Sequence, residues 1–278
     1  MIHNFISLLR HDISQGIIHK WKQFLVSALL FAFSAFVFTK HVNSFFAHNN
    51  IDSKTGIIDF LINMFIGNEP YEPETQQGIR LSIIWFVFHA FLFSFPGFYI
   101  NDDLKKNATA FILRVKSRRQ WWESKFIWCV LTVFAYYTVF FIVICLFSLL
   151  FGSFSLSANE QIAAEFFGLG ISGVKASDML FVSFILPMMI SIAIAVFEAA
   201  LSLIVKPFYS FIIVICYLAA SAFYCDVFLL FNFSMLNRNS LFSGHSEITG
   251  KSGILISLGL IIISYLIGIF AVRKKNIL

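Results

Sequence analysis

The stretch ILISLGLIIISYLIGIFAV, residues 254–272, runs for nineteen residues without a charged side chain. A helix needs about 20 mostly apolar residues to cross the hydrocarbon core of a bilayer. Apolar and polar residues do not alternate along this stretch, as they would in a strand of a membrane β-barrel. The stretch therefore predicts a transmembrane helix, which satisfies its own backbone hydrogen bonds inside the membrane.

Working outward, five further stretches have a similar length and composition. Apolar residues make up 59% of the 278-residue chain and charged residues only 13%, about half the charged fraction of a typical soluble domain. An ordinary soluble enzyme or a disordered chain is excluded on this ground. We predict an all-α membrane protein, a single domain over 1–278, with spans at about 21–39, 81–100, 126–151, 180–204, 208–231 and 254–272.

The net charge of +5 is distributed unevenly along the chain. Segments 1–22, 101–125, 205–207 and 273–278 together hold fourteen Lys and Arg against four acids, whereas the segments on the other side hold six against ten. An excess of Lys and Arg marks the cytoplasmic side of a membrane. Both termini are therefore expected to be cytoplasmic, and the basic balance is explained without a nucleic-acid partner.

The N-terminal residues 1–20 have the pattern of an amphipathic helix. Phe5, Leu9, Ile13 and Ile17 recur every four residues, while most polar side chains fall elsewhere on the helical wheel. Polar residues interrupt the run and no small-residue cleavage site follows, so it is not read as a cleaved signal peptide. We expect this helix to lie in the membrane interface; a cytosolic tail packed on a partner protein is the alternative.

Several polar residues lie within or beside the predicted spans. Glu198 and His89 are intramembrane, where an ionisable side chain usually faces a partner or a cavity. We expect Glu198 to act in coupling or at a subunit interface, or else to be a locally paired or protonated structural residue. We expect His89 to be a hydrogen-bonded packing residue. Asp226 and Asn232 near the end of the fifth span suggest that this helix ends early or that a short piece folds back. No catalytic constellation and no metal-binding spacing is found, and the four cysteines are expected to be buried hydrophobes.

The inner loop NDDLKKNATAFILRVKSRRQWWESK, residues 101–125, is the most informative polar segment. Asp102 and Asp103 are placed to cap the start of a new helix. Its basic residues and Trp121-Trp122 fit anchoring on the cytoplasmic side. Anchoring alone does not explain the apolar face of residues 108–115, which indicates a docking surface.

At this loop the sequence resembles the permease subunits of type-2 ABC exporters. The loop of that family has an acidic residue, a small residue, a Leu-rich stretch, a Pro-x-Ser/Thr-Arg turn and a Gly-Lys at the third span. Here the Pro is replaced around Val115-Lys116 and the Gly by Ser124. The counterparts in this chain are Asp103, Thr109, Phe111-Ile112-Leu113, Ser117-Arg118 and Ser124-Lys125.

The resemblance implies that 101–125 is a cytoplasmic coupling loop that contacts a separate ABC ATPase subunit. No GxxxxGK[ST] motif occurs in the chain, so ATP and Mg would bind the partner and this chain would not be an enzyme. A second permease chain, identical or different, would complete the pathway in the cell membrane of a bacterium. The residues expected to contact the ATPase are Asp103, Thr109, Phe111, Ile112, Arg114, Ser117 and Arg118.

The sequence therefore favours the permease subunit of an ATP-driven exporter, with an antimicrobial or other peptide, a lipid or an amphipathic drug-like molecule as its substrate. An ion- or proton-coupled secondary transporter is an alternative, although no internal repeat is apparent. A membrane-embedded immunity or assembly protein without a transport cycle is another. An intramembrane enzyme is less favoured, since the spans lack paired acids, paired histidines or a Ser/Lys dyad.

Overall fold

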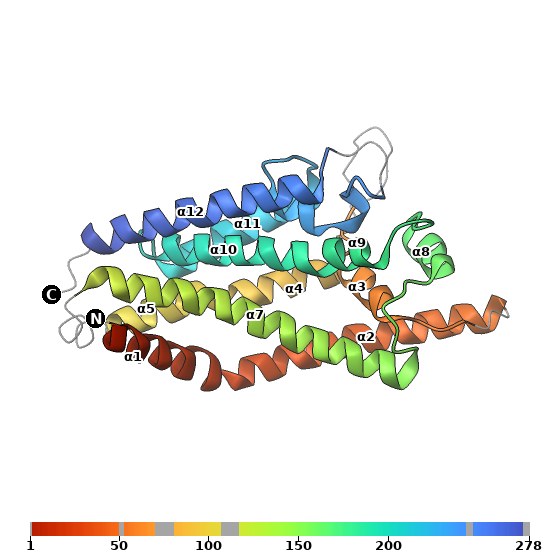
Figure 1. Cartoon of the computed structure of the whole chain (residues 1–278), viewed down its shortest axis with the longest axis horizontal. Helices are drawn as coiled ribbons and strands as arrows, with labels where there is room; N and C mark the ends of the chain where they lie inside the picture. Colours follow the sequence, from red (N-terminus) through yellow and green to blue (C-terminus); the bar gives the residue numbers. More distant parts are fainter. Residues whose placement is uncertain (1, 50–52, 70–80, 107–116, 243–246, 275–278) are drawn as a thin grey trace.

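The computed structural model describes residues 2–49, 53–69, 81–106, 117–242 and 247–274. The described residues form helices and connecting segments, with no strand among them. The long helices lie side by side in an elongated bundle (Figure 1). Five of them are long and apolar enough to cross a membrane, at Trp21–Asn49, Ile83–Leu104, Arg118–Phe151, Ala176–Ser202 and Gly250–Lys274.

The expected fifth span is shorter than predicted. Helix α11, Pro207–Phe223, has 17 residues and ends eight residues before the expected boundary at Phe231. The chain then forms two 3₁₀ helices, Leu230–Ser234 and Leu236–Arg238, the first of which is wholly buried. Asp226 and Asn232 suggested either an early helix end or a piece that folds back. Both are seen, because α11 ends early and the chain after it packs against the bundle.

The buried side chain of Arg238 explains why α11 stops where it does. Its guanidinium donates to the carbonyl oxygens of Ser221 (2.6 Å), Ala222 (2.9 Å) and Tyr224 (3.0 Å). These carbonyls at the end of the helix have no partner in the helix itself. Asn232 is fully buried and completes this network through its Nδ2, which donates to the Tyr224 and Asp226 carbonyls.

The second span is broken once and extends further than predicted. Helix α4, Ile83–Phe93, ends just before Ser94, and α5, Pro96–Lys106, begins two residues later. Pro96 has no N–H to continue the helical hydrogen bonds. Because α5 continues to Lys106, Asp102 and Asp103 lie in its interior and do not cap the start of a new helix, which corrects that expectation.

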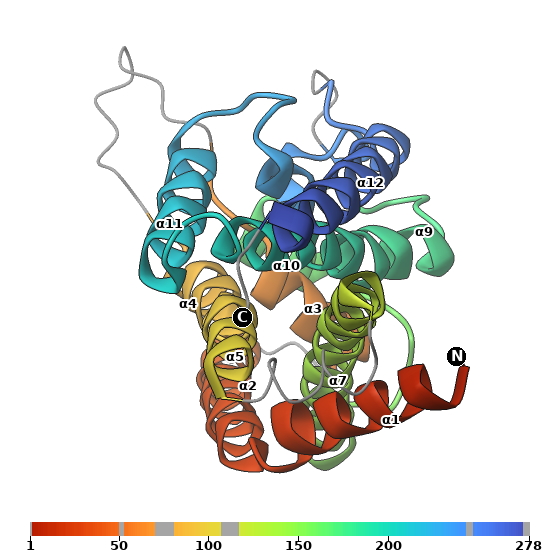
Figure 2. The ribbon, with the colours of Figure 1, turned by 90° about the vertical axis from the view of Figure 1, so that its left-hand side faces the viewer.

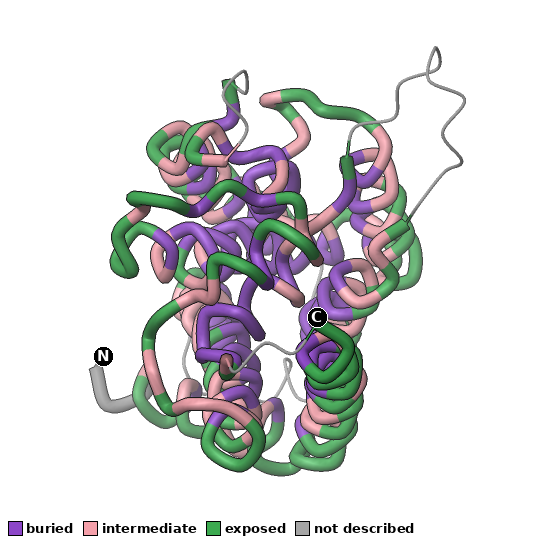
Figure 3. Tube along the Cα trace, turned by 90° about the vertical axis from the view of Figure 1, so that its right-hand side faces the viewer, coloured by how far each residue is buried: buried purple, intermediate pink, exposed green. Residues whose placement is uncertain are grey.

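Helix α10, Leu186–Ser202, lies at the centre of the bundle and packs against α12 (Gly250–Lys274), α7 (Arg118–Phe151), α5 and α11. It follows α9, Ala176–Leu180, and a π-helical turn, Phe181–Ile185. Viewed along the bundle, α10 sits between α11 and α12 on one side and α2, α4, α5 and α7 on the other (Figure 2). Figure 3 shows the buried residues concentrated inside this arrangement and the exposed ones on the outer helix faces.

The N-terminal helix is present, but its buried face differs from the predicted apolar stripe. Helix α1, Ile2–Ile13, continues into a π-helical segment, Ser14–Ile18, before α2, Trp21–Asn49, begins. Leu8, Asp12 and Gly16 are its buried side, whereas Phe5, Leu9, Ile13 and Ile17 are only partly buried. The face that packs on α7 is therefore centred on a charged residue.

The opposite end of the bundle is held by short helices. Helix α3, Ile57–Phe65, is almost entirely buried, and α8, Glu160–Phe167, packs beside it. The Asp59 carboxylate accepts the backbone N–H of Gly56 (2.7 Å) and that of Asn159 (2.9 Å). One buried carboxylate thus joins the segments that follow α2 and α7.

The cysteines differ in their surroundings. Cys129 is buried and Cys145 is partly buried, as expected of small hydrophobes. Cys216 and Cys225 are exposed, which corrects the expectation for these two.

Candidate functional site

The start of α1, the end of α5, the start of α7 and the end of α12 all lie at the same end of the bundle (Figure 1). The loop predicted to contact a partner joins α5 to α7 at this end. Its residues Thr109, Phe111, Ile112 and Arg114 lie outside the described part of the chain. The structure describes the two flanks of this loop, which are the end of α5 on one side and Ser117 with the start of α7 on the other.

The flank on the α7 side begins with Ser117 and Arg118. The Ser117 hydroxyl accepts the N–H of Gln120 at 3.3 Å and caps the helix. The guanidinium of Arg118 donates to the carbonyl of Arg273 in the last turn of α12 at 3.0 Å. The first residues after the loop are therefore attached to the C-terminal helix.

A buried ionic cluster lies between the two flanks. The Lys125 ammonium of α7 lies 2.6 Å from Oδ2 of Asp103 on α5 and also bonds to Oδ1 of Asp12 on α1. All three side chains are at most 3% exposed. Separating a buried ion pair leaves an uncompensated charge away from water, which is strongly unfavourable. This cluster therefore fixes the relative positions of the three helices that carry its residues.

Further donors surround the two carboxylates. Asp12 accepts hydrogen bonds from the Tyr99 hydroxyl (2.9 Å) and the Ser124 hydroxyl (2.5 Å). Asp103 accepts one from the Trp121 indole N–H at 3.2 Å, and His11 Nε2 lies 3.7 Å from its other oxygen. The Lys125 ammonium also lies over the Tyr99 and Trp121 rings, at 5.0 and 5.3 Å from their centroids. The carboxylates are therefore solvated by protein groups in place of water.

The structure thus brings Asp103 together with residues that were not predicted as site residues. Asp103 itself is buried and faces inward, toward Lys125, rather than outward on the loop. Asp12 and Tyr99 were missed. One signal was available for Asp12, since it is one of only four acids among fourteen basic residues in the segments assigned to the inner side.

The two ionisable residues that were predicted to lie within spans, His89 and Glu198, are both fully buried and lie on different helices. His89 of α4 donates through Nδ1 to the Trp85 carbonyl at 2.9 Å, and its ring packs on the rings of Trp85 and Phe231. This is the hydrogen-bonded packing residue that was expected. Glu198 of α10 has neither oxygen hydrogen-bonded to a described residue, so local pairing, one of the states expected for it, is not seen.

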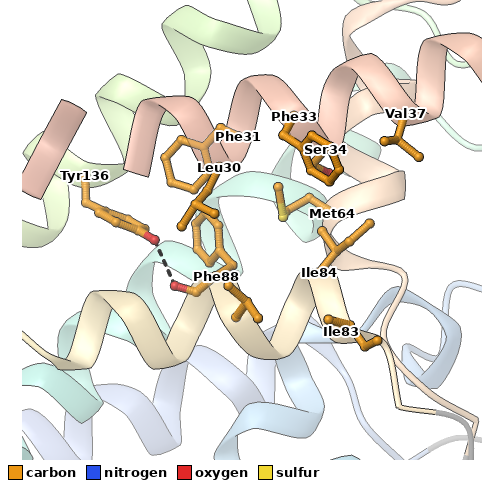
Figure 4. A pocket seen from close by; sticks show the side chains of 11 residues that line it. Leu30, Phe31, Phe33, Ser34, Val37, Met64, Ile83, Ile84, Phe88 and Tyr136 are labelled. Carbon is orange, nitrogen blue, oxygen red and sulfur yellow. Dashed lines mark hydrogen bonds between the residues drawn. The ribbon is translucent and has the colours of Figure 1, made fainter. Parts of the chain in front are cut away.

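An apolar groove of about 230 Å³ lies between α2 and α4 (Figure 4). Phe33 and Ile83, each more than two-thirds exposed, stand on its two walls. The Tyr136 hydroxyl at its edge donates to the Phe88 carbonyl at 2.9 Å, and the buried Ser34 hydroxyl has no partner among the described residues. None of the predicted site residues lines this groove.

Comparison with known families gives one match. Residues 36–278 match the family described as "Protein of unknown function (DUF2705)". The chain belongs to this family. The matched region includes Asp103 and Lys125 but not Asp12, so the N-terminal partner in the ionic cluster lies outside it. No curated protein and no solved structure matches the chain.

Proposed function

We propose that this DUF2705 chain is the transmembrane permease subunit of an ATP-driven exporter of the type-2 ABC class. The observation that carries the proposal is the cluster of Asp12, Asp103 and Lys125, which links the two flanks of the loop to each other and to α1. A loop held in this way transmits a push or a pull to two long helices at once.

The proposed mechanism is mechanical. A partner that moves the loop displaces the end of α5 and the start of α7, and the salt bridge between Asp103 and Lys125 makes them move together. The helix bundle then changes between two arrangements, which is the usual physical basis of coupling between distant sites. This chain performs no catalytic step, and ATP and Mg bind to the partner ATPase.

The proposed topology has six spans, with α11 as the short fifth one, and both termini in the cytoplasm of a bacterial cell. The inner-side segments identified by charge border helix ends that lie together at one end of the bundle, and this supports the proposal. A second permease chain, identical or different, would form the pathway with this one. The substrate class is a peptide, a lipid or an amphipathic drug-like molecule.

Copurification from gently solubilised membranes tests the partner. We expect an ABC ATPase to copurify with the wild-type chain and to be lost with the double variant Arg114→Glu plus Arg118→Glu, whose reversed charges lie on the loop and its flank. If the wild-type chain copurifies with no ATPase, or if its transport persists when cellular ATPases are removed, the proposal is wrong. The second outcome would favour a secondary transporter.

A matched pair of aspartates tests the role of the cluster. Asp103 is buried against Lys125, and its neighbour Asp102 is exposed on the same helix. We expect Asp103→Asn to keep the ATPase bound but to uncouple ATP hydrolysis from transport, with Asp102→Asn as the control of unchanged behaviour. Equal coupling in the two variants would contradict the mechanical role.

A further inference from the structure

Glu198 occupies an unusual position in the bundle. It lies on α10, four residues before the helix ends at Ser202, and is 0% exposed. On α5 the backbone of Gly97 lies directly against it, so that a Cβ placed on Gly97 would lie 3.1 Å from Oε1. The Gly97 N–H faces the carboxyl group, but its geometry falls short of a hydrogen bond.

Two serine hydroxyls on the helices around Gly97 do not donate to Glu198. The same Cβ would lie 3.1 Å from the Ser210 hydroxyl of α11 and 3.5 Å from Cβ of Ser202. The Ser202 hydroxyl donates to the Ala199 carbonyl at 2.7 Å, and that of Ser210 to the Pro207 carbonyl at 2.8 Å. Each hydroxyl has a single proton, so both offer Glu198 only acceptor lone pairs.

Among the described residues, no charged group on the surrounding helices is paired with Glu198. On α7 the group that interacts with it electrostatically is the Cys129 thiol. The Lys125 ammonium of α7 and the Asp103 carboxylate of α5 are bonded in the ionic cluster, and His89 of α4 donates to its own helix. Helix α12 carries charged residues only near its ends, at Lys251, Arg273 and Lys274. Helix α11 carries none, and Lys206, which caps its start, is exposed.

A carboxyl group in such a place favours its neutral form. An ionised carboxylate that is buried without a donor or a counter-ion takes up a proton instead of remaining charged. As an acid, Glu198 has a proton to donate to acceptor oxygens around it. Asp12 and Asp103 show the opposite situation at the same end of the bundle, since several donors and an ammonium surround them.

We propose that Glu198 is a proton-binding site whose occupancy depends on the contact between α5 and α10. While Gly97 packs against Glu198, the carboxyl group keeps its proton. When α5 moves away and water enters, the O–H bond breaks, the proton passes to water as hydronium, and the carboxylate remains on α10. Packing therefore requires the proton, and proton loss favours separation.

The site has a direct connection to the ionic cluster. Helix α5 carries both Gly97, which faces Glu198, and Asp103, which binds Lys125. A displacement of α5 at the loop therefore changes the surroundings of Glu198. This proton site does not depend on the chain's being a transporter subunit, because it rests on the packing around Glu198 and not on a partner protein.

Infrared spectroscopy of the full chain in lipid bilayers tests the proposal. We expect a carbonyl band of a protonated carboxyl group at neutral pH that is lost in Glu198→Gln. Transfer to D₂O should shift this band slowly, because exchange requires α5 to separate from α10. Absence of a band that depends on Glu198 would overturn the proton site, and a shift as fast as that of an exposed acid would overturn its control by packing.

Gly97→Ala provides a second variant. The added methyl group presses on Glu198 and Ser210, so we expect looser packing and a faster deuterium shift of the same band. Gly259→Ala on α12 is the control, because a Cβ there meets nothing within 4 Å. Equal shift rates in the two variants would show that the α5–α10 contact does not hold the proton.

Discussion

The Lys125 ammonium of α7 lies 2.6 Å from Oδ2 of Asp103 on α5, so these two helices, which are consecutive in the described part of the chain, are joined directly. The pair is buried, and the Asp12 carboxylate of α1 shares the same ammonium. Three segments that are far apart in the sequence therefore depend on one cation. The consequences for stability can be measured without any knowledge of a substrate.

Lys125→Met should destabilise the protein strongly. Removing the ammonium leaves two buried carboxylates side by side, and breaking a buried pair in this way typically costs about 3–5 kcal/mol. We expect a markedly lower midpoint of thermal unfolding in detergent.

Arg119→Met is the matched control for Lys125→Met. It removes another paired cation of α7, but the pair between Arg119 and Glu123 is largely exposed. Such surface pairs contribute little to stability. Similar midpoints for the two variants would contradict the structural role given to the cluster.

The buried carboxyl group of Asp59 should make stability depend on pH. Burial raises its pKa to about 6, although the N–H groups of Gly56 and Asn159 partly oppose the shift. The folded protein therefore binds this proton more readily than the unfolded chain, whose pKa is near 3.8. Stability should increase as pH falls from 7 through 6 toward 4, by at most about 3 kcal/mol.

Thermal unfolding between pH 4 and 7 measures this effect. In Asp59→Asn the slope over this range should be smaller, because the amide does not titrate. An unchanged slope would assign the pH dependence to other groups.

Gly268→Ala should separate α12 from α7. A Cβ at Gly268 would lie 2.0 Å from the Trp122 ring, whose indole N–H donates to the Tyr265 carbonyl at 3.0 Å. Overpacking of this kind typically costs about 1–3 kcal/mol. Gly259→Ala, on the same helix and in open space, should unfold at the wild-type temperature or above, since alanine favours the helix. Equal destabilisation by the two changes would argue against the close contact.

Arg238→Lys should loosen the end of α11. Lysine keeps the charge, but it cannot reach the Ser221, Ala222 and Tyr224 carbonyls together, because it lacks the planar fork of donors. We expect a loss on the order of 2–3 kcal/mol and faster hydrogen exchange at the C-terminal end of α11. Wild-type exchange in this segment would show that the helix end does not depend on Arg238.

Much of the helical framework could be predicted from the sequence. Apolar runs of membrane-spanning length identify all five long helices, since the period and length of such runs carry most of the information. Helix ends are less predictable. Helix α11 stops at Phe223 because Arg238, fifteen residues further on, accommodates its carbonyls. A contact of this range has no local sequence signal.

The site could be predicted only in part. Ser117 and Lys125 were found at the loop through the resemblance, and the structure places Ser117 at the N-cap of α7 and Lys125 within this helix. The partner Asp12 could not be found in this way, because its pairing with Lys125 spans more than a hundred residues. The scarcity of acids on the inner side singles out Asp12, but nothing local in the sequence shows that it turns inward onto α7.

Helix α2 is longer than the hydrocarbon core of the membrane that it was predicted to cross is thick. Its 29 residues span about 44 Å at 1.5 Å per residue, against roughly 30 Å of hydrocarbon, and its far end extends beyond the rest of the bundle (Figure 1). A straight rod of this length that pivots by about 10° at its α1 end swings its tip by roughly 7–8 Å. Spectroscopic labels near His48 would therefore act as an amplified gauge of small rotations at the opposite end of the protein.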